Sequence, residues 1–513
     1  MSVRPSSPAA QGSAGALPAV AWSALLSLAG AKFLLHAAVS ARYGFFRDEL
    51  YFLACGRHLQ WGYVDDAPGI AILSRLALQL GGSLPAVRLL AALAGAGTVL
   101  LAGLLARELG GGRFAQVFAG LCTLAAPVFL VEHGLLCVGA FEPWFWLGCA
   151  WLALRAARSW DGRYWLALGA VAGLGILLKY TMGLVLVCFL LALVLSPSRR
   201  VLAWPPFWVG AFLAVLLALP ALLWQVHNHW PLLADLANIR RLHKNVQLPP
   251  AAFLLQQAMM LHPLLAPVWI AGLVRLLRRP SERFLGFWYL ALLAAMMALH
   301  GKDYYLAAFY PLLFAAGAAA CEAWFRPRPR AVLAVLAGML CALNASAFTP
   351  ILPPARLKAW QARLGVREVK QERSFDGPLM QPFSDQFGWP ELAQETAAIY
   401  RALPAEERAR TAVFAANYGE AGAIDQFGPA LGLPPAVCAH NAYSLWGPPA
   451  EEPATVICLG VDRAGLERCF ESVTEAGQHH HPWGMGYENR PIFIGRGLKR
   501  PIRELWPQIT LWN

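Results

Sequence analysis

Residues 46–69, FRDELYFLACGRHLQWGYVDDAPG, decide how the rest of the chain is read. They follow directly on the first long apolar run and carry two pairs of carboxylates, Asp48 with Glu49 and Asp65 with Asp66. A carboxylate at the centre of a membrane helix costs roughly 2.5 to 3.5 kcal/mol on insertion scales. Two such pairs beside a spanning segment therefore predict a polar cavity at the membrane surface, and this cavity is the candidate active site.

The composition indicates a polytopic membrane protein. Of the 513 residues, 58% are hydrophobic and only 14% are charged, which lies outside the usual range of soluble domains. The net charge of +12 could suggest nucleic acid, but the arginines cluster in short loops between apolar runs, as the positive-inside rule produces, so we exclude that partner. The ten cysteines show no CxxC spacing, which predicts neither a metal finger nor a disulfide framework. A bridge stays open only in the tail, among Cys438, Cys458 and Cys469.

Eleven apolar runs are near the length needed to cross a bilayer. Residues 1–16, rich in Ser, Pro, Ala and Gly, are expected to be a flexible cytoplasmic leader. The first run, 17–39, is too long for a signal-peptide core, so we expect an uncleaved span. The other ten runs are 85–106, 114–131, 139–156, 164–178, 181–196, 204–223, 263–277, 284–299, 305–323 and 331–348.

The loops between these runs alternate in charge. Every second loop is rich in arginine and should therefore face the cytoplasm. The alternate loops should face outward, and they hold nearly all the residues of the membrane part that could carry chemistry: Asp48, Glu49, Asp65, Asp66, Glu132, Glu142, Lys179, Lys302 and Asp303. The pattern thus gathers these groups on one side of the bilayer.

Beyond about residue 349 the long apolar runs stop. Short β-type runs at 412–415, 455–461 and 491–494 alternate with helical patterns at 391–403 and 464–470. We therefore expect a domain boundary at this point, between a transmembrane domain at 17–348 and a soluble α/β domain at 349–513. An odd number of spans places that domain outside the cytoplasm.

Several motifs carry a resemblance to a known family. These are DE at 48–49, YVDDAP at 63–68, FEP at 141–143, GILLKY at 175–180 and HGKDYY at 300–305. Together they resemble the bacterial family 39 glycosyltransferases, which are related to protein O-mannosyltransferases and to the lipid A aminoarabinose transferase. The resemblance covers roughly residues 40–320. It implies a GT-C fold in the bacterial cytoplasmic (inner) membrane, a polyprenyl-phosphate-linked sugar donor and catalysis on the outer face.

The carboxylates suit general-base chemistry. Glycosyl transfer with inversion needs a base that takes the proton of the acceptor hydroxyl. The resemblance places this base on Asp48, with Glu49 in support, although acids in the first turn of a helix also simply stabilise it. Glu142 resembles a second acid that positions the acceptor or the base, and it too could be a helix N-terminal residue. Three residues before Glu142, where relatives often have Asp, this chain has Gly139.

Asp65 and Asp66 could hold a divalent metal ion, because hard cations take paired carboxylate oxygens. The alternative is an Asp-rich turn before Pro68. This tract departs from the family, which has Lys or Gln where Asp66 stands, so the lipid phosphate needs another ligand. An Arg of related enzymes is likewise replaced, here by Tyr51.

Lys179 and Lys302 are the candidate ligands of the donor phosphate, since a fixed cation stabilises a leaving phosphate. Lys302 is followed closely by Tyr304 and Tyr305, which join it in the predicted site. Lysines at the ends of spans can also reach lipid headgroups without any specific role.

The sequence thus predicts a membrane glycosyltransferase that moves a sugar from a polyprenyl phosphate carrier to an acceptor outside the cytoplasm: a lipid, a polysaccharide or a protein. The rival function is a transporter or lipid flippase with a periplasmic binding domain, and a non-catalytic receptor is a third. Transporters usually place ionisable groups near the membrane midplane, whereas these lie at the ends of spans.

Overall fold

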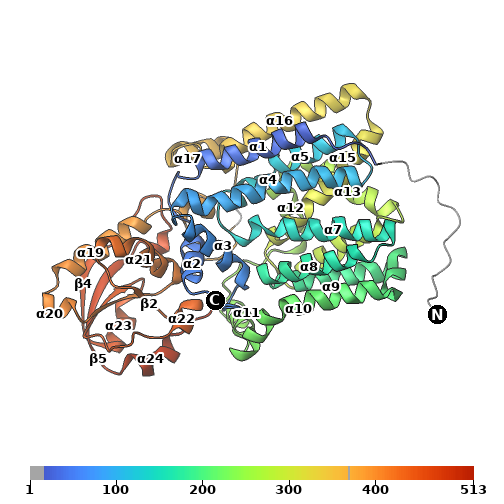
Figure 1. Cartoon of the computed structure of the whole chain (residues 1–513). Coiled ribbons are helices and arrows are strands. Elements are labelled where there is room, and N and C mark those ends of the chain that lie inside the picture. Colours follow the sequence, from blue (N-terminus) through green and yellow to red (C-terminus); the bar gives the residue numbers. More distant parts are fainter. Residues whose placement is uncertain (1–16, 368–369) are drawn as a thin grey trace.

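The computed structural model describes residues 17–367 and 370–513, so the predicted leader 1–16 lies outside the described residues. Each of the eleven apolar runs coincides with a helix or a broken helix of one bundle (Figure 1). These helices are α1 (Trp22–Val39), α4 (Leu84–Glu108), α5 (Arg113–Ala125) with α6 (Pro127–Glu132), α7 (Glu142–Ser159), α8 (Arg163–Leu178), α9 (Thr181–Val194), α10 (Pro205–His227), α13 (Ala266–Arg278), α14 (Arg283–Ala298), α15 (Tyr310–Trp324) and α16 (Pro327–Phe348).

The bundle is that of a multi-pass membrane protein. Within the described residues, five helices are long and apolar enough to cross a membrane, and seven if each of two bent helix pairs counts as one span. Three further apolar helices, α5, α8 and α14, are shorter than this limit. Length and composition therefore support between five and seven spans, while the remaining predicted spans fall on shorter or more polar helices.

Glycines allow two pairs of helices to pack with their backbones in contact. A Cβ atom at Gly210 of α10 would overlap the carbonyl of Trp165 in α8. In the same way, a Cβ atom at Gly317 of α15 would overlap the carbonyl of Val268 in α13. Small residues at such contacts are the usual means by which membrane helices approach closely.

The basic loops meet at one end of the bundle, as the alternation of charge predicts. The buried carboxylate of Glu108 accepts hydrogen bonds from Arg155 and Arg158, both at 3.0 Å. The nearby Glu282 pairs with Arg275 at 2.9 Å. These residues belong to three of the basic loops, which are far apart in sequence. The structure therefore brings these three loops together at one end of the bundle.

The opposite end carries the shorter helices and the connection to the C-terminal part. Two helices, α2 (Arg47–Arg57) and α3 (Pro68–Gln79), flank the second pair of carboxylates. The remaining elements of the helical part are η1 (Val138–Ala140), η2 (Pro197–Ala203), α11 (Pro231–Arg241), α12 (Pro250–Leu261), η3 (Pro263–Leu265), η4 (Asp303–Phe309) and α17 (Pro354–Arg363).

The C-terminal part is a mixed five-stranded sheet with helices, in the strand order β2-β1-β3-β5-β4. The strands β1, β2 and β3 are parallel, whereas β5 is antiparallel to β3 and to β4. The predicted strands lie on β1, β3 and β5 and the predicted helices on α19 and α23, while β2 and β4 were not predicted. The elements are α18 (Gln381–Ser384), α19 (Trp389–Ala402), α20 (Ala405–Arg408), β1 (Thr411–Ala415), α21 (Tyr418–Leu431), β2 (Ala436–Cys438), α22 (Ala442–Trp446), β3 (Thr455–Leu459), α23 (Arg463–Cys469), β4 (Phe470–Gln478), η5 (Gly486–Glu488), β5 (Pro491–Leu498) and α24 (Ile502–Ile509). All ten cysteines are free.

The sheet region docks on α2 at one end of the bundle (Figure 1). Leu50 and Leu53 of α2 are fully buried and share one apolar core with Ala421 and Ile424 of α21. The helices touch closely, because a Cβ atom at Gly422 would lie 2.8 Å from the side chain of Leu50. Residues 46–69 thus form the floor on which the C-terminal part sits.

We expect Gly317→Val to destabilise the protein by about 1–3 kcal/mol or more, because the added side chain must push α15 away from α13. Gly338→Val is the matched control, since Gly338 also lies in a membrane helix but a Cβ atom there meets nothing within 4 Å. Thermal unfolding of the detergent-solubilised variants measures the difference. Equal midpoints for the two variants would contradict the close α13–α15 contact.

Candidate active site

Asp48 lies in the first turn of α2, at the junction of the bundle and the sheet region. Its side chain is 32% exposed, and it accepts a hydrogen bond of 3.0 Å from the hydroxyl of Tyr418, the first residue of α21. The guanidinium of Arg47 lies 3.5 Å from the same carboxylate oxygen and 5.3 Å from the ring of Tyr418. Asp48 is therefore an accessible carboxylate whose orientation is fixed from both parts of the chain.

Glu49, in contrast, is fully buried and fully engaged. Its carboxylate accepts hydrogen bonds from the backbone N–H of Phe46 at 2.8 Å and of Leu136 at 2.9 Å. It also forms a buried ion pair with Arg88 of α4 at 3.1 Å. These contacts make Glu49 a structural anchor that holds the start of α2, and hence Asp48, against the bundle.

Arg88 links Glu49 to two further parts of the chain. Besides Glu49 it donates hydrogen bonds to backbone carbonyls of the segment between α1 and α2 and to a side chain of the C-terminal part; the acceptors are Ser40, Arg42, Gly44 and Gln386. Burial of a charge is tolerated when its hydrogen-bonding capacity is satisfied in this way.

Asp65 and Asp66 lie beside Asp48 but make different contacts. Asp65 accepts hydrogen bonds from the hydroxyl of Tyr51 at 2.7 Å and from the amide of Asn441 at 3.0 Å. Burial raises the pKa of the Asp65 carboxyl above its ordinary value. Burial and the neighbouring charge of Asp65 raise the pKa of Asp66 well above its ordinary value. The hydroxyl of Tyr51 thus orients the carboxylate of Asp65.

Glu142 and Lys179 form an ion pair at the mouth of the bundle. The amine of Lys179 lies 3.3 Å from the carboxylate of Glu142 and 4.2 Å from the ring centre of Tyr305. The ring of Tyr304 stands edge-on to that of Tyr305, with centres 5.0 Å apart. The structure therefore brings together four of the residues that the sequence singles out.

Gly139 packs closely against Glu132. A Cβ atom at Gly139 would lie 2.6 Å from the Oε1 atom of Glu132. The carboxylate of Glu132 therefore occupies the space next to position 139.

Lys302 is also paired with a carboxylate. Its amine donates a hydrogen bond of 2.9 Å to Glu372, which lies in the segment before α18. Burial by itself would lower the pKa of Lys302, but the charge of Glu372 raises it above its ordinary value. Lys244 approaches the other oxygen of Glu372 at 3.8 Å.

These pairs belong to one cluster. Besides burial and nearer partners, the charge of Asp48 contributes to raising the pKa of Asp65, Asp66 and Lys302. Asp235 of α11 joins the cluster from the loop after α10, and burial, followed by the charge of Asp65, raises its pKa to about 7. The arrangement offers an accessible base, fixed cations and aromatic walls, as transfer from a phosphate leaving group requires.

Sequence reasoning missed five of these contributors. Arg88 offered a signal, because an arginine inside an apolar run is by default structural or functional. Tyr418 lies in a helix-start pattern, Asn417 with Glu420, which indicates no role for the tyrosine itself. The others, Asn441, Asp235 and Glu372, gave no local signal.

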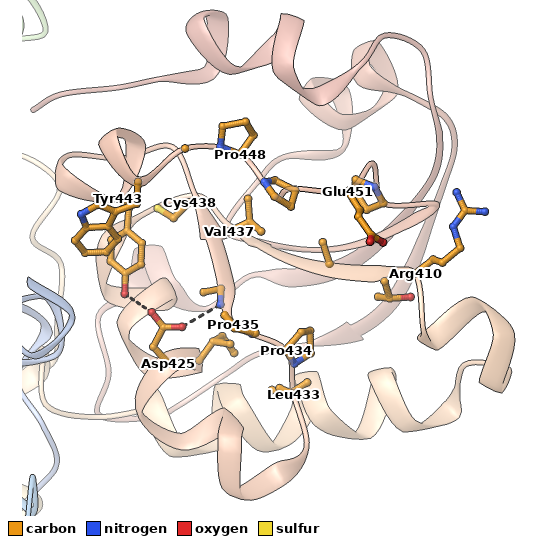
Figure 2. Close-up of a pocket in the computed structure, with 18 of the residues that line it drawn as sticks. Arg410, Asp425, Leu433, Pro434, Pro435, Val437, Cys438, Tyr443, Pro448 and Glu451 are labelled. Atoms are coloured by element: carbon orange, nitrogen blue, oxygen red, sulfur yellow. Dashed lines mark hydrogen bonds between the residues drawn. The ribbon is translucent and has the colours of Figure 1, made fainter. Parts of the chain in front are cut away.

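Figure 2 shows a cavity of about 820 Å³. None of the residues that line it belongs to this cluster. Arg57 and His58 at the end of α2 form one side, and the β2 region with its flanking prolines forms the other. The carboxylate of Asp425 in its wall accepts hydrogen bonds from the N–H of Ala436 and the hydroxyl of Tyr443 (Figure 2). The cavity therefore lacks the cluster's combination of an accessible carboxylate with paired lysines.

Comparisons with known proteins agree with the resemblance found in the sequence. Residues 65–224 match the family model described as dolichyl-phosphate-mannose-protein mannosyltransferase. The structure is similar to that of ArnT from Cupriavidus metallidurans in the apo state, with a TM-score of 0.59, 16% identity, and coverage of 93% of this chain and 98% of that chain. The same protein bound to undecaprenyl phosphate gives a TM-score of 0.60 at 14% identity, with the same coverage.

A weaker likeness, with a TM-score of 0.46 and 14% identity, is to the archaeal oligosaccharyltransferase AglB from Archaeoglobus fulgidus in complex with an inhibitory peptide and a dolichol-phosphate; it covers 79% of this chain and 63% of that chain. A search of curated proteins gives no match.

The comparisons show two things: the chain has the fold of ArnT, a membrane protein of the GT-C type, and its residues 65–224 match a family of glycosyltransferases. The matched segment covers about a third of the 513 residues, whereas the shared fold covers 93% of the chain. The segment includes Asp65, Asp66, Glu142 and Lys179, whereas Asp48 and Lys302 lie outside it.

We expect Arg88→Met to destabilise the protein by about 3–5 kcal/mol, because it leaves the buried Glu49 carboxylate without its cation. Arg75→Met, at an exposed position of α3, is the control and should unfold like the parent. Thermal unfolding in detergent tests the pair of variants. An Arg88→Met midpoint equal to that of Arg75→Met would show that this ion pair is not the anchor.

Proposed function

We propose that this protein transfers a sugar from a polyprenyl-phosphate-linked donor to an acceptor on the outer face of the bacterial cytoplasmic membrane, with inversion at the anomeric carbon. The observation that carries the proposal is Asp48, an accessible carboxylate held by Tyr418 and Arg47 within a cluster of paired lysines. The fold shared with a structure of ArnT bound to undecaprenyl phosphate supports the choice of donor.

Asp48 is the base in this proposal. Its carboxylate accepts the proton of an acceptor hydroxyl while that oxygen attacks the anomeric carbon. The bond between the anomeric carbon and the phosphate oxygen breaks, and the electron pair leaves with the polyprenyl phosphate. Tyr418 donates a hydrogen bond to one oxygen of Asp48 and thereby orients the carboxylate. Glu49 acts through position alone, because its own oxygens are occupied.

Two lysines stabilise the leaving phosphate. Positive charge placed where negative charge develops lowers the barrier, and more so in a site that excludes water. Lys179 is oriented by Glu142 and by the ring of Tyr305. Lys302 approaches from the loop before η4, next to Tyr304. The phosphate would bind between the two tyrosines and these amines.

The acidic pair of the 65–66 tract also admits a divalent ion as a hypothesis. Among the described residues, however, no group of three or more His, Cys, Asp or Glu side chains could hold a metal ion. Asp65 already accepts hydrogen bonds from Tyr51 and Asn441. The steps above therefore use the charges of the protein itself.

The topology follows the alternation of the loops. We propose eleven passes, with the helical domain at 17–348, the arginine-rich end of the bundle in the cytoplasm, and the α/β domain at 349–513 outside. In support, the residues of the cluster and the sheet region share one end of the bundle, and the network around Glu108 lies at the other.

Protease added to intact spheroplasts should digest the sheet region and spare the arginine-rich loops, because only the first would be exposed outside the membrane. Immunoblots with tags at the two ends of the chain read the fragments. Inverted vesicles are the control and should show the opposite pattern. Digestion of the sheet region in inverted vesicles alone would overturn the proposed orientation.

The sharpest test of the function is Asp48→Asn, because Asn keeps the shape of the side chain but cannot accept a proton as a base. Transfer from a polyprenyl-phosphate sugar should fall by roughly 100- to 10,000-fold, the usual contribution of general-base catalysis. Donor binding should be largely retained. The measurement is turnover of purified protein with a labelled donor.

Asp161→Asn is the matched control, since Asp161 is a partly exposed acid in the basic loop between α7 and α8. It should retain the activity of the parent. A stably folded Asp48→Asn protein with turnover within threefold of the parent would remove Asp48 from the catalytic role and leave it as a helix-capping residue.

A further inference from the structure

Glu372 lies between two lysines of the candidate site. Its carboxylate accepts a hydrogen bond from Lys302 at 2.9 Å through one oxygen and lies 3.8 Å from Lys244 through the other. All three side chains are largely buried, with exposed fractions of 7% for Glu372, 17% for Lys302 and 23% for Lys244. Two amines that converge on one buried anion form a small anion-binding site.

Three cations act on the carboxylate of Glu372. Burial would raise the pKa of Glu372, but the charges of Lys302, Lys244 and Arg47 lower it to about 2. Negative charge is also present nearby, because Asp48 contributes to raising the pKa of Lys302 and Asp235 acts in the same direction on Lys244. A carboxylate under the influence of three cations occupies a place that suits a phosphate, whose oxygens accept charge-assisted hydrogen bonds from several donors at once.

In the described part of the chain, Glu372 belongs to no helix and to no strand of the sheet. It forms an isolated antiparallel bridge in which the N–H of Val246 donates to Gln371 at 2.9 Å and the N–H of Arg373 donates to Lys244 at 3.0 Å. The side chain of Gln371 adds a hydrogen bond to Asp303 at 2.8 Å. In comparison, Glu142, the partner of Lys179, lies in the first turn of the 18-residue helix α7. Displacing Glu372 therefore disturbs no helix, whereas displacing Glu142 would disturb the start of α7.

We propose that Lys244 joins Lys302 in the phosphate site of the lipid carrier, and that Glu372 is a built-in competing anion. The carrier phosphate displaces Glu372 when it binds, and Glu372 returns to the lysines when the product leaves. The inference rests on the proposed function, to which it adds a third phosphate ligand, Lys244, and a residue that controls release.

The difference in charge between donor and product explains how a competing carboxylate would help the product to dissociate. A polyprenyl-phosphate sugar is a phosphodiester with one negative charge, as on a carboxylate. The product is a phosphate monoester, which carries about −1.5 to −2 charges near pH 7. A site of two lysines without a competitor would therefore hold the product more tightly than the donor. A competing carboxylate weakens both complexes and allows the product to leave.

The test is Glu372→Gln, which keeps the size of the side chain and removes its charge. Binding of undecaprenyl phosphate to the purified, detergent-solubilised full chain should become at least about tenfold tighter, the scale of one charge-assisted contact. Under turnover, product inhibition by added undecaprenyl phosphate should strengthen by a similar factor. Glu372→Asp, whose shorter side chain retreats from Lys302, should give an intermediate affinity and serves if the Gln variant does not fold.

Glu407→Gln is the matched control, because it removes another paired carboxylate, the partner of Arg496 and Thr455 in the sheet region. It should leave binding unchanged. In a Lys302→Ala background, Glu372→Gln should lose most of its effect on affinity, since the two residues act through one contact. Phosphatidylglycerol tested in place of undecaprenyl phosphate should show no comparable tightening.

The outcomes separate the inference from the function on which it rests. If the parent binds no undecaprenyl phosphate, the proposed function fails. If the parent binds it and both Glu372 variants bind equally well or more weakly, the carboxylate is a structural partner and the competition fails. Equal tightening toward phosphatidylglycerol would show a general site for lipid phosphates and would overturn the assignment to the carrier.

Discussion

The buried ion pair between Glu49 and Arg88 is the contact on which the arrangement of the site depends. It joins the start of α2 to α4, the segment after α1 and Gln386 of the C-terminal part. Charges placed in a low-dielectric interior are costly unless every donor and acceptor is satisfied, so the pair tolerates little displacement. Asp48 is the next residue along the chain from this fixed point. Its accessible position is therefore a consequence of its neighbour's burial.

The two acids of the DE motif therefore have different roles: Glu49 anchors the helix, and Asp48 is the accessible carboxylate. Adjacent residues in a helix point about 100° apart, because there are 3.6 residues per turn. In the first turn of α2, one side chain faces the interior of the bundle and the other faces the junction with the sheet region. The same motif therefore supplies a structural anchor and a chemical group, and only the three-dimensional surroundings show which is which.

Much of the architecture could be predicted because it depends on long, simple patterns. Eleven apolar runs coincide with helices, and the alternation of charge in the loops predicted which residues gather at each end. The parts that could not be predicted depend on pairing between distant segments. Glu372 meets Lys302 across 70 positions and Tyr418 meets Asp48 across 370, and no local periodicity records such contacts. From its residue type, Asp65 was a candidate for a metal ligand or for a turn residue. Its hydrogen bonds with Tyr51 and Asn441 could not be predicted, because Asn441 is distant in sequence.

The contribution of the C-terminal part to the site also sets an order on the assembly of the protein. Chains generally fold from the N-terminus as they are synthesised. Asp48, Lys179 and Lys302 emerge with the first 302 residues, but the side chains that orient or neutralise them, Tyr418 and Glu372, follow later. The helical part made first therefore holds its acids and lysines without these partners. The docking of α21 on α2 is the event that completes the site, so a nascent chain acquires its active arrangement only near the end of synthesis.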